Sequence, residues 1–137
     1  MGLTLKEMVA TARSQTQEIL PDEAAEADSR SQLDLIVDVR EPGEFQESHL
    51  PRAVNVPRGV LELRADPASP GADPTLSADQ SARILVYCTR GPGARSLLAA
   101  QTLTSMGYEN IEVLAGGLMA WTEAGLPVEG TAQPPSA

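Results

Sequence analysis

Short apolar runs alternate with segments of helical periodicity along most of the chain. Strands are predicted where apolar residues cluster, at residues 33–39, 53–56, 84–87 and 111–114, and a short edge strand is predicted at residues 18–20. Helices are predicted at residues 4–15, 22–27, 59–64 and 116–121, and from the loop after residue 88 to residue 105. This alternation predicts an α/β fold whose mostly parallel sheet is covered by helices on both faces.

The pattern predicts one domain with an additional segment at each end. A chain of 137 residues is long enough to close a single core. Residues 1–17 are predicted to be an N-terminal helix and residues 18–128 to be the domain. Within the domain, residues 66–80 contain three prolines and few residues that could pack, so we expect a mobile surface loop. We expect residues 129–137 to be a disordered tail.

Cys88 lies where the fourth predicted strand passes into a helix through a loop that contains glycine and proline. In α/β proteins, ligands bind at the ends of strands where such loops lie. The loop leaves backbone N–H groups without helical partners, and a helix start adds partial positive charge, so an anion or a thiolate is stabilised there. Cys88 is therefore a candidate nucleophile.

The local charge supports this role for Cys88. The whole chain has a formal net charge of -9, yet residues 83–108 contain no Asp or Glu and include Arg83, Arg90 and Arg95. Helix N-termini and neighbouring cations lower the pKa of a thiol from about 8.5 to roughly 3.5–7.5, so we expect a thiolate at neutral pH. The alternative is that Cys88 is a small buried hydrophobic residue, as many free cysteines are. The glycine loop and the arginines favour the nucleophile.

Composition argues against several classes of protein. A single cysteine excludes an internal disulfide, a CxxC redox pair and a zinc cluster. The acidic balance, with one lysine, argues against nucleic acid and anionic membranes as partners. No apolar run is long enough to span a bilayer, and the first residues lack the layout of a signal peptide. We therefore expect a cytoplasmic protein without a metal site.

Three motifs, in this order, resemble those of the rhodanese homology domain. The first extends from Asp38 to Phe45 and continues through residues 48–57, the second covers residues 86–96, and the third covers residues 116–128. Together they span about residues 18–128. The resemblance implies a single-domain rhodanese-like fold with a five-stranded parallel sheet and helices on both faces.

The resemblance also implies a sulfurtransferase that needs no cofactor. In that chemistry the Cys88 thiolate attacks the outer sulfur of thiosulfate or a related donor, and the resulting persulfide passes its sulfur to cyanide or a thiol. The implied substrate-binding residues are Thr89, Arg90, Gly91, Gly93, Ala94 and Arg95. Near the site, Asp38 and Arg40 are predicted to form a buried pair, and His49 is predicted to be a hydrogen-bonded structural residue.

The spacing of the second motif leaves alternatives open. Six residues separate Cys88 from Arg95, two more than is common in the family. Either the loop is wider, or Gly93 closes it and Arg95 lies on the following helix. A longer loop also resembles that of the phosphatases and arsenate reductases that share this fold. A different alternative is a sulfur-delivery or regulatory module that receives its sulfur from a partner protein.

Overall fold

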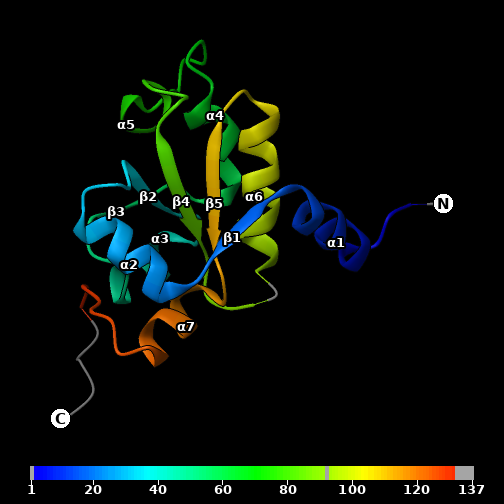
Figure 1. Cartoon of the computed structure of the whole chain (residues 1–137). Helices are drawn as coiled ribbons and strands as arrows, with labels where there is room; N and C mark the ends of the chain where they lie inside the picture. Colours follow the sequence, from blue (N-terminus) through cyan, green and yellow to red (C-terminus); the bar gives the residue numbers. More distant parts are fainter. Residues whose placement is uncertain (1, 92, 132–137) are drawn as a thin grey trace.

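The chain folds around one sheet of five parallel strands (Figure 1). The structure is a computed structural model that describes residues 2–91 and 93–131. The strands are β1 (Gln17–Ile19), β2 (Leu35–Asp38), β3 (Ala53–Asn55), β4 (Arg83–Tyr87) and β5 (Asn110–Leu114). Their order in the sheet is β1-β5-β4-β2-β3, and every neighbouring pair is parallel. The predicted five-stranded parallel sheet is confirmed.

Helices cover both faces of this sheet, as predicted. They are α1 (Leu5–Gln15), α2 (Pro21–Ser29), α3 (Pro42–Glu47), the 3-10 turn η1 (Arg58–Val60), α4 (Leu61–Ala65), α5 (Pro74–Ser77), α6 (Ala94–Ser105) and α7 (Gly117–Glu123). The buried side chains of α1, α4, α5 and α6 pack on one face, and those of α2 and α7 pack on the other. Among the described residues, no helix has the length and apolar character needed to cross a membrane.

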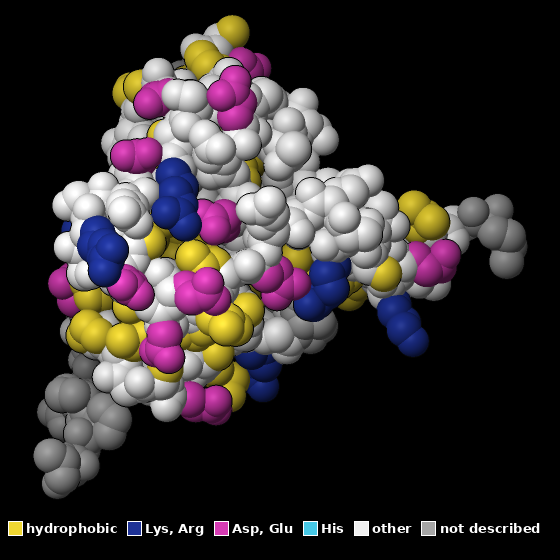
Figure 2. All heavy atoms as spheres, in the orientation of Figure 1, with side chains coloured by type: hydrophobic (Ala, Val, Ile, Leu, Met, Phe, Trp, Pro, Cys, Tyr) yellow, Lys and Arg dark blue, Asp and Glu magenta, His cyan; other side chains and the backbone are white. Residues whose placement is uncertain are grey.

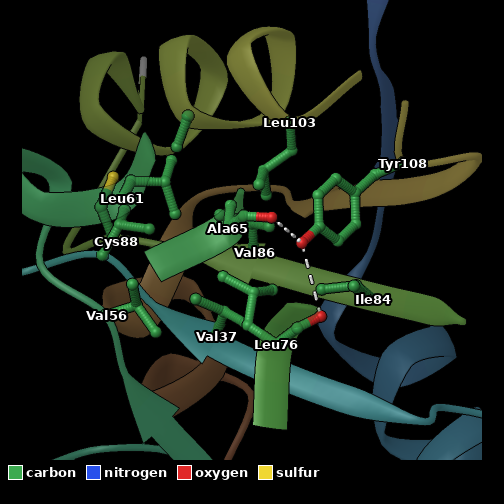
Figure 3. Close-up of a cluster of buried hydrophobic side chains, with 12 residues drawn as sticks. Val37, Val56, Leu61, Ala65, Leu76, Ile84, Val86, Cys88, Leu103 and Tyr108 are labelled. Atoms are coloured by element: carbon green, nitrogen blue, oxygen red, sulfur yellow. Dashed lines mark hydrogen bonds between the residues drawn. The ribbon is translucent and has the colours of Figure 1, made fainter. Parts of the chain in front are cut away.

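Strand β4 contributes to the cores on both sides of the sheet, because successive side chains of a strand point to opposite faces. Ile84 and Val86 lie in the cluster beneath α4 and α6, whereas Leu85 and Tyr87 lie in the cluster beneath α2 and α7. Cys88 continues the first series and belongs to the first cluster (Figure 3). The alternation in β4 therefore sets the side of the sheet on which the thiol lies.

Residues 66–80 pack more closely than the sequence indicated. They contain helix α5, whose N-cap Asp73 accepts a hydrogen bond from the backbone N–H of Thr75. Leu76 is buried in the cluster beneath α4, and this corrects the expectation that little in the segment could pack. The physical reason is tertiary, because the Leu76 side chain fills space against Tyr108 and Ala65 (Figure 3).

Both ends of the described chain contact the domain. Helix α1 begins at a capping box formed by Thr4 and Glu7 and packs against α6. At the other end, Glu129 forms an antiparallel bridge with His49. Residues 129–131 of the expected tail are thus attached to the domain, which corrects the predicted start of disorder. Residues 132–137 lie outside the described residues.

Tyr108 provides a test of the core beneath α4. Its buried hydroxyl donates a hydrogen bond of 2.7 Å to the carbonyl oxygen of Ala65. Tyr108→Phe leaves that carbonyl without this donor, so we expect the free energy of unfolding to fall by about 1–3 kcal/mol. Urea denaturation of both proteins measures the change. An unchanged midpoint and slope would show that the carbonyl finds another donor.

Candidate functional site

The loop after β4 has the predicted strand–loop–helix geometry. It begins at Cys88 and ends at Gly93, which is the N-cap of α6 and adopts a left-handed conformation with φ of 74°. Arg95 is the second residue of the helix. The extra length between Cys88 and Arg95 is therefore explained by the alternative in which Gly93 closes the loop.

The sulfur of Cys88 is held close to the start of α6. Cys88 is 3% exposed, and its Sγ lies 3.3 Å from Oγ of the buried Ser96. The same hydroxyl lies 3.1 Å from the carbonyl oxygen of Gly93, to which it can donate. A Cβ at Gly93 would lie 3.1 Å from Ser96 Oγ and 4.0 Å from the sulfur, so glycine keeps this side of the thiol uncrowded.

A pocket of about 380 Å³ opens above Cys88. Its lining residues are Glu44, Cys88, Thr89, Arg90, Gly91, Gly93, Ala94 and Arg95. The structure thus brings together Cys88 and all six residues predicted to bind substrate. A larger hollow of about 670 Å³ lies elsewhere, beside the amino-terminal ends of β4 and β5, and none of its lining residues is a cysteine or a histidine.

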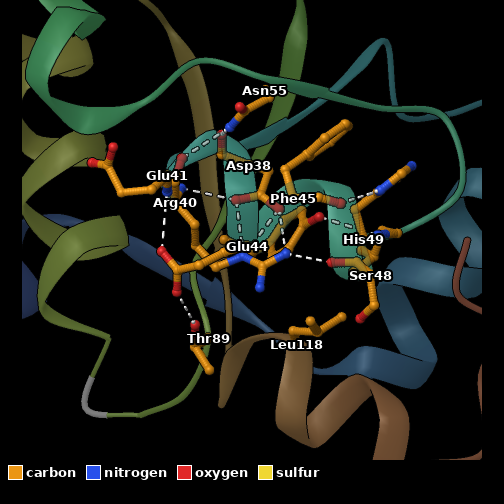
Figure 4. A network of polar contacts seen from close by, with 12 residues as sticks. Asp38, Arg40, Glu41, Glu44, Phe45, Ser48, His49, Asn55, Thr89 and Leu118 are labelled. Carbon is orange, nitrogen blue, oxygen red and sulfur yellow. Dashed lines mark hydrogen bonds and ion pairs between the residues drawn. The ribbon is translucent and has the colours of Figure 1, made fainter. Parts of the chain in front are cut away.

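Glu44 is a pocket residue that the sequence analysis missed. Its carboxylate accepts hydrogen bonds from both terminal nitrogens of Arg95, at 2.7 and 3.2 Å. Arg95 also donates to the Thr89 hydroxyl at 3.1 Å. The same hydroxyl lies 3.4 Å from the Glu44 carboxylate (Figure 4). The Arg95 hydrogen bond is the main cause that lowers the pKa of Glu44 to about 2. Both partners of this pair are therefore charged at neutral pH.

The order of strands in the sheet explains why Glu44 lies at the pocket. It lies on the short helix after β2, and β2 is the neighbour of β4 in the sheet. The carboxyl ends of parallel neighbours meet at one edge, so residues that follow β2 lie near the Cys88 loop. The order of strands was not predicted, and within the motif from Asp38 to Phe45 only Asp38 and Arg40 were placed near the site.

The predicted pair of Asp38 and Arg40 is present and buried. The Asp38 side chain is fully buried, and its carboxylate accepts from Arg40 Nη2 at 2.8 Å and from the Arg40 backbone N–H at 2.8 Å. Asn55 donates to the backbone carbonyls of both residues, at 3.0 and 2.9 Å. Neither charged residue lines the pocket, so this network fixes the backbone at the end of β2 (Figure 4).

His49 also lies outside the pocket lining and makes structural contacts. Its Nδ1 is 2.7 Å from the carbonyl oxygen of Phe45, and the two rings stack with their centroids 3.9 Å apart. Its backbone pairs with that of Glu129. These contacts join α3 to the end of the described chain.

Helix α7 packs directly on the backbone of the Cys88 loop. The N–H of Leu118 donates to the Cys88 carbonyl and that of Met119 donates to the Thr89 carbonyl, both at 2.9 Å. This approach requires glycine at position 117, where φ is +61° and a Cβ would lie 2.6 Å from the Cys88 carbonyl oxygen. Gly117 therefore allows α7 to approach the backbone of the Cys88 loop closely.

The described residues offer no ready metal site. Among residues 2–91 and 93–131, no group of three or more His, Cys, Asp or Glu side chains is arranged to hold a metal ion. The chemistry that the pocket offers is that of a thiol, the Thr89 hydroxyl, a carboxylate and two guanidinium groups.

Solved structures of other proteins share this fold. A solved structure from Rhodopseudomonas palustris, described as a protein of unknown function and a possible tyrosine phosphatase, is 33% identical. It matches with a TM-score of 0.84 over 94% of this chain and 96% of its own. The human single-domain sulfurtransferase is 25% identical, with a TM-score of 0.67 over 79% of this chain and 96% of its own.

Sequence comparison identifies the family. A sulfurtransferase from Allochromatium vinosum is 31% identical over 94 residues, which are 69% of this chain and 77% of that protein. The chain spans about half the length of two other curated relatives. The family model for the rhodanese-like domain matches residues 20–124. The chain therefore belongs to the rhodanese-like domain family and is related to its single-domain sulfurtransferases.

Proposed function

We propose that the protein is a sulfurtransferase that carries sulfur as a persulfide on Cys88. The observation that supports this most directly is the position of the chain's one cysteine at the base of the pocket, beside the Ser96 hydroxyl. The Cys88 thiolate attacks the outer sulfur of the donor, and a new S–S bond forms as the old one breaks. With thiosulfate the leaving group is sulfite, which takes the electron pair of the broken bond.

The second half of the proposed reaction unloads Cys88. A thiol or cyanide attacks the outer sulfur of the persulfide, and the Cys88 thiolate leaves with the electron pair. With cyanide the product is thiocyanate. These 137 residues contain no second cysteine, so no other thiol within them can take the sulfur from Cys88. The acceptor must therefore come from another molecule, and neither step requires a cofactor.

The loop supplies stabilisation for the charges that move between sulfurs. Ser96 can donate its hydroxyl hydrogen to the Cys88 sulfur when that sulfur is a thiolate. Arg90 is exposed, and it makes no ion pair among the described residues. We assign Arg90 as the cation that first meets an anionic donor.

A second candidate function is sulfur delivery within a protein assembly. In this case Cys88 receives sulfur from a partner protein and shows little turnover with small donors. The chain spans about half the length of some curated relatives, so in those proteins the related region accompanies other segments. The net charge of -9 also suits a basic partner surface.

The phosphatase alternative has less support. It is suggested by the description of the Rhodopseudomonas structure as a possible tyrosine phosphatase. Such phosphatases use a cysteine and an arginine of one phosphate-sized loop, and here both terminal nitrogens of Arg95 are bonded to Glu44, so Arg90 is the one pocket arginine left to hold a phosphate group. Hydrolysis of an aryl phosphate by the wild type, lost in Cys88→Ser, would favour the phosphatase over the sulfurtransferase.

The persulfide is tested by intact mass. Reduced protein incubated with thiosulfate is expected to gain one sulfur atom, and the gain should disappear on addition of cyanide or a thiol. Cys88→Ser should remain folded and gain nothing, because the nucleophile is absent. A gain of sulfur by Cys88→Ser would show that Cys88 is not the carrier. No gain by the folded wild type would favour a protein donor.

The role of Ser96 is tested by Ser96→Ala. Hydrogen bonds to charged groups contribute about 1.5–3 kcal/mol, so we expect kcat/KM to fall by about 10- to 100-fold with every donor. Ser105→Ala, at the exposed end of the same helix, is the matched control and should leave kcat/KM unchanged. An effect of Ser96→Ala confined to KM of one donor would show that Ser96 binds that donor and does not stabilise the thiolate.

A further inference from the structure

We infer that Glu44 selects the sulfur donor, because it cancels the positive charge of Arg95 in the pocket. The favoured donors are then sulfane-sulfur compounds that carry a single negative charge, such as organic thiosulfonates and persulfides, rather than dianionic thiosulfate. This inference rests on the proposed function, since it takes Cys88 as the sulfur carrier. It names the class of donor that the pocket accepts.

The first support is the geometry of the Glu44–Arg95 contact. The two carboxylate oxygens bind the two terminal nitrogens of the guanidinium, at 2.7 and 3.2 Å. One of these nitrogens also binds the Thr89 hydroxyl. A donor that used Arg95 would therefore have to displace a bidentate carboxylate, which is a strong and geometrically matched partner.

The second support is the charge of the pocket lining. Its described charged residues are Arg90, Arg95 and Glu44, so two positive charges stand against one negative charge. One net positive charge remains, and ionisation of Cys88 removes it. Electrostatic energy scales with the product of the charges, so a dianion gains or loses twice as much as a monoanion at the same place. Repulsion by the Glu44 carboxylate therefore raises the electrostatic energy of thiosulfate in the pocket more than that of a singly charged donor.

The third support is that Glu44 is held in this position by its own helix. The backbone N–H of Glu41 donates to Glu44 Oε1 at 3.0 Å, as part of a capping box at the start of α3. The lowered pKa of Glu44 means that the carboxylate stays charged from neutral to mildly acidic pH. Glu44 is thus a fixed negative charge at the pocket and cannot be neutralised by ordinary changes in pH.

The transfer step is the same for both classes of donor. With methanethiosulfonate, the Cys88 thiolate attacks the terminal sulfur, an S–S bond forms, and methanesulfinate leaves with the electron pair of the broken bond. With a persulfide, the leaving group is the parent thiolate. No oxidant or reductant is consumed, because the outer sulfur only exchanges one partner sulfur for another.

The experiment compares thiosulfate with methanethiosulfonate in the wild type and in Glu44→Gln. Both donors give the same Cys88 persulfide, whose rate of formation is followed by intact mass in single-turnover reactions. Glutamine keeps the shape of the side chain and removes its charge. We expect the second-order rate constant to rise about threefold for methanethiosulfonate and about tenfold for thiosulfate, because the logarithm of the effect doubles with the donor's charge.

Glu47→Gln is the matched control. It makes the same change of charge on the same helix, and Glu47 is exposed and does not line the pocket. It should leave the ratio of the two rate constants unchanged. A ratio that also stays unchanged in Glu44→Gln, or equal losses with both donors, would overturn the inference and make Glu44 a residue that only positions Arg95.

Failure of the proposed function has a different signature. If neither donor loads sulfur onto Cys88 in the wild type or in Glu44→Gln, the persulfide mechanism with small donors is wrong, and the inference falls with it. If both donors load sulfur and their ratio does not respond to Glu44, only the inference is overturned.

Discussion

Asp38 and Arg40 form a buried ion pair at the end of β2. Their contact fixes the start of the segment that carries Glu44, the acidic residue of the pocket. Arg40 also donates to the Ser48 carbonyl beyond α3, so a single guanidinium holds both sides of that helix. Loss of one member of a buried pair leaves an uncompensated charge and costs about 3–5 kcal/mol. The placement of Glu44 therefore depends on a contact outside the pocket.

The site is built where the carboxyl ends of two neighbouring strands meet. The Cys88 loop follows β4, and helix α3 follows β2. Helix α7 packs on the backbone of the Cys88 loop at Gly117. Two segments distant in sequence thus line one pocket, and a third, α7, supports the Cys88 loop. The loop provides a nucleophile and positive charge, and α3 provides a negative charge. The chemistry of the pocket is the balance between these contributions.

The residues that were predicted from the sequence are those whose role is local. The strands were visible as apolar runs, and Cys88 was visible as the residue between a strand and a glycine loop. Glu44 was not recognised, because its partner Arg95 lies 51 residues further along the chain. Leu76 was not recognised for the same reason, since its burial depends on packing against other segments and not on its own proline-rich surroundings.

The burial of Cys88 also determines how far each reactant must enter the pocket. Cys88 is 3% exposed, so a donor must bring its sulfur almost to the base. Once the persulfide forms, the reactive atom lies about 2 Å beyond the cysteine sulfur, which is the length of an S–S bond. The acceptor therefore needs a shorter reach than the donor. One entrance therefore serves a slender donor that reaches the base of the pocket and a bulkier acceptor that stops short of it. The depth that a reactant must reach then distinguishes the loading of sulfur onto Cys88 from its removal.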